Sequence, residues 1–437
     1  MKQDEGLIRA LGVRGLSAGM INYMIGAGIF VLPALVAAQV GAAAPLIYII
    51  CAIAMGLIVL CFADAGSRVS LSGGTYAYAE LAFGPFLGFI VATSLWFGSS
   101  VLASAAIANV LMDTLAQLVP FFGDRVVRIL TILAVYGLFT AINIRGVKMG
   151  SRVVQTVTLA KLTPLLILIA AGLFAMNTGN LTWPGMPSID KIGRAAVILI
   201  FAFLGIETAL NVSGEVRDPS RTVPRAIVST IVIVTLIYMG LQFVSQGVLG
   251  ADLATNTKAP LAETARRVLG SGGESLVLIG TAISTFGYLS GDMLCSPRGL
   301  YALGRDELLP RFIGSVSDRY HTPYVAIAIH AGLSAAFAIT GSFAGLLVMA
   351  TLATLIVYLI CCAATIKLQR MDIRTEGAKP FKLSGGPIIP VIACAIVIWL
   401  MTNSTQQEFL ALAAMLGVET LIFLIMRARA VAQRVPA

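Results

Sequence analysis

The sequence predicts an all-α protein that crosses a membrane many times. Of its 437 residues, 58% are hydrophobic and only 12% are charged, and the mean hydropathy is +0.92. Soluble domains typically carry about 25% charged residues. Apolar runs of ~18 or more residues recur along the whole chain, and each is long enough to cross an ~30 Å hydrocarbon layer as a helix. The predicted fold class is therefore a polytopic bundle of helices.

Twelve apolar runs predict twelve transmembrane helices. The first run is too long for a cleavable secretory signal, and little chain is left for a soluble domain. The predicted spans are 15–39, 45–67, 86–118, 126–143, 153–176, 192–213, 224–247, 274–304, 324–341, 344–368, 386–402 and 408–427.

The formal charge of +9 reflects membrane topology. With an even number of spans and the N-terminus inside, most of the 30 Lys and Arg residues fall on one face, as the positive-inside rule requires for the cytoplasm. We therefore expect a multi-pass protein of the cell (inner) membrane with both termini cytoplasmic, and no nucleic-acid partner. The six cysteines have neither zinc nor disulfide spacing, so neither a metal site nor another cofactor is predicted.

The first and sixth spans have weak centres. Gly26-Ala27-Gly28 stands in the middle of "NYMIGAGIFVLP", and Gly205 stands in "FAFLGIET". Unpaired backbone groups cost several kcal/mol in hydrocarbon. A broken helix is therefore tolerated there only where other protein shields its unpaired groups or where they line a cavity. The two spans are five apart, and five crossings reverse the direction of the chain. Two inverted halves would bring both breaks together near the midplane.

A broken helix has the chemistry to bind a zwitterion. The half before the break ends in free carbonyl groups, which suit an ammonium group, and the half after it begins with free N–H groups, which suit a carboxylate. Close packing of small residues between helices is the alternative explanation for any one glycine. The coincidence of two weak centres five spans apart favours the break.

Four motifs in this order resemble the amino acid–polyamine–organocation (APC) transporter superfamily, in its amino acid permease branch. They are "IGAGIF", "GGTYAYAELAFG", "FAFLGIET" followed by "EVRDPSRTVPRA", and "SPRGLYALGRDELLP", within roughly residues 10–370. The resemblance implies a LeuT-type fold: a 5+5 inverted repeat with discontinuous helices 1 and 6, plus two C-terminal helices. The divisions are a cytoplasmic tail (1–14), the first repeat (15–176), the second repeat (190–368), helices 11 and 12 (386–427) and a cytoplasmic tail (428–437).

The resemblance also implies a substrate site at the first break. Met24 and Ile25 would offer carbonyl oxygens to the amino group of an amino acid, Gly26 would allow the turn, and the amides of Ala27 and Gly28 would receive the carboxylate. The family usually has Ser at the position of Ala27. Because the backbone amide binds the carboxylate, this difference removes only a hydroxyl group.

Three residues of the sixth span and one of the eighth complete the implied site. Phe201 and Leu204 match positions that contribute carbonyls or cover the ligand, with Phe201 as a lid, and Gly205 marks the unwound point. Asp292 matches a position near the substrate side chain. There it would attract a cationic side chain or titrate during transport, unless it pairs with a nearby cation such as Lys161.

Ionisable residues within a span are functional candidates, because each costs ~2.5–3.5 kcal/mol to insert at the helix centre. Lys161 matches a family lysine that takes the place of a sodium ion, so we expect proton coupling or sodium-independent exchange. The alternative is a permanently charged strut between the first and eighth spans. Glu207 either binds a proton or caps amides freed by the break. His330 is interpreted as structural and Glu419 as interfacial.

Secondary active transport of amino acids by alternating access is thus the predicted function, as proton symport or as exchange. An antiporter of cationic amino acids or polyamines is one alternative, although a polyamine lacks the carboxylate that the Ala27 and Gly28 amides would bind. A membrane-embedded enzyme is less favoured, because no nucleophile, metal or phosphate-loop motif is found. A transport-inactive nutrient sensor would need an output domain. The sequence leaves the oligomeric state undecided.

Overall fold

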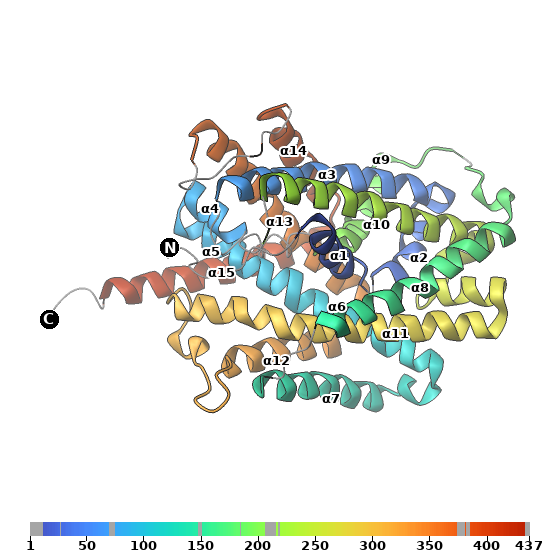
Figure 1. Cartoon of the computed structure of the whole chain (residues 1–437), viewed down its shortest axis with the longest axis horizontal. Coiled ribbons are helices and arrows are strands. Elements are labelled where there is room, and N and C mark those ends of the chain that lie inside the picture. The colour runs from blue at the N-terminus through green and yellow to red at the C-terminus, as the bar shows by residue number, and fades with distance from the viewer. Residues whose placement is uncertain are drawn as a thin grey trace.

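The computed structural model describes residues 12–26, 28–69, 75–146, 151–183, 185–205, 216, 219–373, 381 and 385–432. Within these ranges the chain is helical and contains no β-strand. The long helices run roughly along the longest axis of the molecule (Figure 1). This parallel arrangement is expected of a membrane bundle, whose backbone polar groups must be satisfied inside each helix.

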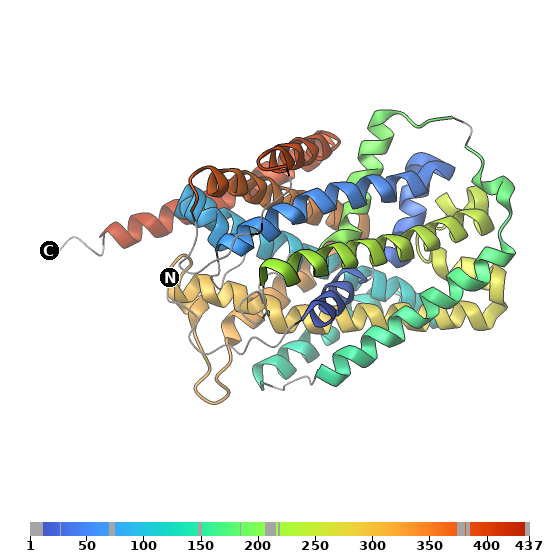
Figure 2. The ribbon, with the colours of Figure 1, turned by 45° about the horizontal axis from the view of Figure 1, so that its top comes forward.

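The first predicted span is two helices. α1 comprises Val13–Met24 and α2 comprises Gly28–Val40, with the break at the glycines that weaken the span. α3 (Ala44–Arg68) follows and packs against α10 (Pro219–Leu249). The two helices lie side by side in Figures 1 and 2.

The third predicted span changes helix type in its middle. α5 (Pro85–Ser94) continues into a π-helix, η2 (Leu95–Leu102), and then into α6 (Ala103–Leu118). π-Helical turns interrupt the regular hydrogen-bond ladder and are frequent at functional sites. η2 packs closely on α13 (Phe343–Arg370), because a Cβ atom built on Gly98 would lie 2.2 Å from the Cβ atom of Ala353.

The sixth predicted span also stops being helical at its weak centre. α9 (Ile189–Ile200) is followed by one 3₁₀ turn, η5 (Phe201–Phe203). Leu204 is then extended, with ψ 152°, and Gly205 has φ +100°, a left-handed conformation that favours glycine. The "FAFLG" stretch therefore ends a helix, as the sequence predicted.

The other predicted spans each have a helical counterpart, and a short helix, α4, lies in the loop after α3. α11 is the longest, and Gly270 (φ +72°) bends it near its start. The bounds are α4 Thr75–Phe83, α7 Arg125–Ile144, α8 Ser151–Ala175, α11 Pro260–Arg305, α12 Tyr324–Thr340, α14 Ile388–Thr402 and α15 Gln406–Ala432.

Among the described residues, seven helical segments are long and apolar enough to cross a membrane, and three shorter helices are apolar. This confirms an all-helical, multi-pass membrane protein. The count of twelve crossings and the inverted repeat remain predictions. The divisions at 15–176, 190–368 and 386–427 remain predictions as well.

Candidate functional site

The break between α1 and α2 is a tight turn. Ile25 has φ −79° and ψ 71°, and the Gly26 N–H donates to the Met24 carbonyl oxygen at 2.8 Å. These values define an inverse γ-turn, which redirects the chain within three residues. In a continuous helix the Gly26 N–H would instead bond to Asn22. The turn therefore leaves the Asn22 carbonyl available to another donor.

Tyr238 of α10 touches the ends of both interrupted helices. Its hydroxyl oxygen lies 2.7 Å from the Met24 carbonyl oxygen and 3.1 Å from that of Ala202. The side chain is fully buried, and its ring packs edge-on against Phe203 with centroids 5.7 Å apart. A phenol has one hydrogen, so the two carbonyl oxygens share a single donor. This contact holds the first and sixth spans together at their breaks.

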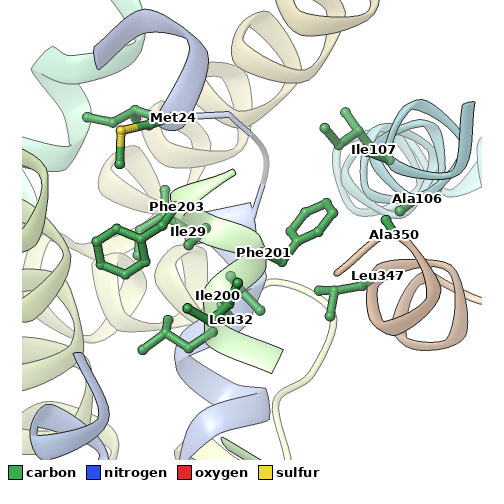
Figure 3. Packing of buried hydrophobic residues seen from close by; sticks show 14 of the residues in the cluster. Met24, Ile29, Leu32, Ala106, Ile107, Ile200, Phe201, Phe203, Leu347 and Ala350 are labelled. Atoms are coloured by element: carbon green, nitrogen blue, oxygen red, sulfur yellow. The ribbon is translucent and has the colours of Figure 1, made fainter. Parts of the chain in front are cut away.

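Phe201 lies at the start of α2. A Cβ atom built on Gly28 would lie 3.2 Å from the Phe201 ring, so only glycine lets the ring approach this closely. In Figure 3 the ring points away from Met24 and toward Ala106 of α6 and Leu347 of α13. Its exposed fraction is 7%. The predicted lid thus covers the N-terminal end of the second half-helix.

A cavity of about 360 Å³ is lined by α6, α7, the end of α12 and the start of α13. Its wall includes Phe343, whose ring is edge-on to Phe201 with centroids 6.3 Å apart. Arg128 in the same wall bonds to Asp113 and to Asn109 Oδ1, each at 2.6 Å. The edge-on contact between Phe201 and Phe343 therefore connects the break to the wall of this cavity.

Comparison with known proteins shows the family of this chain. The sequence profile described as amino acid permease matches residues 11–423. The chain belongs to the amino acid permease family. It is 26% identical to the methylthioribose transporter of Bacillus subtilis (strain 168), over 96% of this chain and 94% of the relative. It is 27% identical to the serine/threonine exchanger SteT of the same organism, over 90% of each chain.

The relatives with assigned names are transporters. The permease is accordingly a multi-pass membrane transporter of amino acids or related solutes, and it is not an enzyme. Family membership also confirms the resemblance that the four sequence motifs indicated.

Lys161 of α8 binds the C-terminal end of α1. Its Nζ atom donates to the Asn22 carbonyl oxygen at 2.6 Å, and its exposed fraction is 4%. This is the carbonyl that the γ-turn leaves available. A cation at a helix C-terminus is also favoured by the helix dipole. α11 approaches the break too, with Ser284 Oγ 3.5 Å from the Gly26 carbonyl oxygen.

Asp292 has a partner that sequence reasoning missed. Its Oδ2 atom lies 2.9 Å from His330 Nε2, and its Oδ1 atom accepts from Ser296 Oγ at 2.5 Å. The alternative pairing of Asp292 with Lys161 is wrong, because the partners of Asp292 are His330 and Ser296. His330 was interpreted as a structural residue without a functional partner. The sequence did carry a signal for this residue. An ionisable side chain within an apolar span is rare, histidine included, and is a functional candidate by its position alone.

The structure brings most of the predicted substrate-site residues together. The turn of Met24, Ile25 and Gly26 continues into Gly28, beside Phe201. Leu204 and Gly205 follow the 3₁₀ turn that Phe201 begins. Ala27 and Glu207 lie outside the described residues.

Asp292 is set apart from this group. It stands eight residues along α11 from Ser284, a rise of about 12 Å. Glu419, interpreted as interfacial, is buried at 6% exposure, and its Oε2 atom accepts from Ser94 Oγ at 2.8 Å. Its side chain therefore faces α5 within the protein, and its depth in the membrane stays a prediction.

Proposed function

We propose that the permease carries out secondary active transport of amino acids across the cell membrane by alternating access. The observation that carries this proposal is the break between Met24 and Gly28. A helix C-terminus and a helix N-terminus meet there under the Phe201 ring. Opposite helix poles at one gap match the ammonium and carboxylate groups of one amino acid.

Substrate binding requires a change at the first break. The Met24 carbonyl oxygen already accepts from Gly26 N–H and lies within bonding distance of the Tyr238 hydroxyl. A carbonyl oxygen has two lone pairs, so the substrate ammonium must displace one of these donors or bind Ile25 instead. The carboxylate would bind the amides of Ala27 and Gly28.

Phe201 would close over the bound substrate. Leu204 and Gly205 supply a non-helical hinge at the end of the 3₁₀ turn that Phe201 begins. The two rings between the break and the cavity at Phe343 support a route that opens when Phe201 moves.

The proposed coupling is proton symport or sodium-independent exchange. Lys161 places a buried cation on a carbonyl of α1, where a sodium-driven transporter would need a metal ion. Loss of its proton would remove the charge from this bond and so weaken the hold of α8 on the Asn22 carbonyl. Glu207 is the second proposed proton-coupling residue. The exchange alternative is supported by the relative named as a serine/threonine exchanger.

Cationic amino acids and polyamines are the second candidate substrate class. Asp292 motivated that alternative, but its carboxylate is bonded to His330 and Ser296. A polyamine would also leave the amides of the second half-helix without an anion. Neutral amino acids therefore fit the geometry better. Because one relative is named as a methylthioribose transporter, methylthioribose must be tested beside the amino acids.

Counterflow in proteoliposomes tests this function. Vesicles loaded with serine, threonine, arginine, putrescine or methylthioribose are diluted into the same labelled solute, without a sodium gradient. We expect labelled serine or another neutral amino acid to accumulate transiently. Counterflow of methylthioribose alone, or of no amino acid, would contradict the proposed substrate class. A requirement for sodium would contradict the proposed coupling.

A further inference from the structure

A buried polar cluster lies between α11, α12 and the π-helix, away from the break. Asp292 accepts from Ser296 on one carboxylate oxygen and faces His330 Nε2 with the other. Ser296 Oγ also lies 3.0 Å from Ser100 Oγ of η2. The cluster thus joins three elements that each contact α6 or α13 in the centre of the bundle.

The acid and the imidazole are sealed from solvent. The side chain of His330 is 0% exposed and that of Asp292 is 6% exposed. The Trp96 ring lies 6.3 Å from the imidazole, measured between centroids. Neither His330 Nδ1 nor Trp96 Nε1 has a hydrogen-bond partner among the described residues. Unpaired buried polar atoms are rare in folded proteins, so these two need an explanation.

No cation neutralises Asp292 among the groups that the structure describes around it. Tyr136 of α7 is the titratable side chain that faces it from that helix, and its hydroxyl lies 3.0 Å from Ser104 Oγ of α6. Lys161 of α8 donates to Asn22. Among the other charged side chains on or against α11, Asp113 pairs with Arg128, Arg311 pairs with Glu307, and Arg221, Arg225 and Arg298 are exposed.

The hydrogen bonds define two charge states for the pair. With one proton on Nε2, His330 is neutral and donates to an ionised Asp292, and the pair carries one negative charge. A second proton, on Nδ1 or on the carboxylate, makes the pair neutral overall. An unpaired negative charge is costly in a buried site, and a neutral or internally paired state is less so. Nδ1 is the one ring position not used by the contact with Asp292.

We propose that the Asp292–His330 pair is a proton-binding site that takes up one proton and releases it in each transport cycle. The inference rests on the proposed transport function and adds a proton site separate from Lys161 and Glu207. Proton uptake changes the net charge of the pair from −1 to zero. The proton comes from water on one side of the membrane and is released to water on the other side.

The position of the pair gives it a way to act on the substrate site. Both Asp292 and Ser284 lie on α11, and Ser284 approaches the carbonyl of Gly26 at the break. A movement of α11 that admits water to the pair would therefore also shift the wall of the substrate site. Since α12 holds His330, separation of α11 from α12 would break the contact that stabilises the ionised acid.

The experiment compares wild type with Asp292→Asn and His330→Gln in proteoliposomes. Glu419→Gln is the matched control, because it also removes a buried carboxylate that accepts from a serine but lies outside the cluster. Counterflow at equal pH reports exchange without net proton movement. A pH-sensitive dye inside the vesicles reports protons that enter with an amino acid. Thermal unfolding in detergent checks that each variant is folded.

We expect Asp292→Asn to keep counterflow within about threefold of wild type and to lose substrate-driven acidification and pH-driven accumulation. His330→Gln should shift the pH midpoint of accumulation, and Glu419→Gln should match wild type. If Asp292→Asn and wild type move the same number of protons per substrate, the proposal is overturned. Wild-type transport without proton movement would overturn it too, while leaving the transport function intact. Absence of counterflow in the folded wild type would instead contradict the transport function.

A binding measurement covers the case in which Asp292→Asn folds but does not transport. Calorimetric titration of the solubilised protein with the amino acid, in buffers of different ionisation enthalpy, counts protons bound with substrate. Wild type should take up a measurable fraction of a proton near neutral pH, and Asp292→Asn should take up less. Equal proton numbers would overturn the proposal.

Discussion

The Tyr238 hydroxyl oxygen lies 2.7 Å from the Met24 carbonyl oxygen, at the point where the first span breaks. The same hydroxyl lies 3.1 Å from the Ala202 carbonyl oxygen in the sixth span. One side chain on a continuous helix therefore occupies backbone groups of both interrupted ones. If a substrate ammonium group binds the Met24 carbonyl oxygen as we propose, Tyr238 would compete with it for that oxygen.

Tyr238→Phe should tighten binding of a neutral amino acid. Removal of a competing hydrogen bond worth about 1 kcal/mol corresponds to roughly a fivefold lower Kd. The melting temperature should fall, because the Ala202 carbonyl loses a buried donor. Calorimetry and thermal unfolding measure the two effects.

Tyr48→Phe is the control for Tyr238→Phe. It removes another fully buried hydroxyl, which bonds to Gln242 away from the break. It should lower stability without changing affinity. Weaker substrate binding in Tyr238→Phe alone would show that the hydroxyl assists the bound state and would contradict competition.

Gly28→Ala should impair transport by pushing the Phe201 ring away from the start of α2. The added Cβ atom would lie 3.2 Å from the ring and 3.2 Å from Leu32 Cδ1, closer than ordinary contact distance. Overpacking of this kind costs ~1–3 kcal/mol, so we expect a five- to hundredfold loss in substrate affinity.

Gly19→Ala in α1 is the matched control, because an added Cβ atom there meets nothing within 4 Å. It should transport like wild type. Equal rates and affinities for Gly28→Ala and wild type would exclude Phe201 as a lid whose position depends on Gly28.

Lys161→Arg separates the two roles considered for this residue. Arginine keeps a permanent charge and can still donate to the Asn22 carbonyl, but it does not release a proton in the physiological range. If Lys161 couples protons, Lys161→Arg should retain counterflow and lose pH-driven accumulation at least tenfold. Lys161→Met should lose pH-driven accumulation as well.

Accumulation that survives in Lys161→Arg but not in Lys161→Met would identify the lysine as a charged strut. Counterflow at equal pH is the reference for both variants, since it needs no net proton movement. Each rate is normalised to the amount of folded protein in the vesicles.

Gly98→Ala should lower stability by separating η2 from α13. The new Cβ atom would lie 2.2 Å from the Cβ atom of Ala353, which the two helices cannot accommodate without moving apart. We expect a loss of ~1–3 kcal/mol. The double variant Gly98→Ala/Ala353→Gly restores space and should recover much of the loss in thermal unfolding.

Gly56→Ala is the control for this pair, because the site on α3 is open. It should leave the melting temperature unchanged or slightly raised. A Gly98→Ala variant as stable as wild type would mean that η2 and α13 are not in close contact in solution.

The sequence by itself determined the helical membrane fold and the location of the breaks. Long apolar runs admit few alternatives in a bilayer, because hydrocarbon offers no partner to an unpaired peptide group. Glycines at Gly26, Gly28 and Gly205 marked where that regular pattern fails, and helices do end beside each of them. Apolar runs and helix-weakening glycines are local features of the sequence, so they can be recognised without the tertiary structure.

Only the tertiary structure decided which polar side chains meet. Lys161 and Asp292 are both ionisable residues in apolar spans, so the sequence left their pairing open as one alternative, yet one bonds to Asn22 and the other to His330. Tyr238 gave no signal as a link between the two breaks. Partners 36 to 214 residues apart depend on helix rotation and packing, which hydropathy does not specify, since every face of a buried membrane helix is apolar.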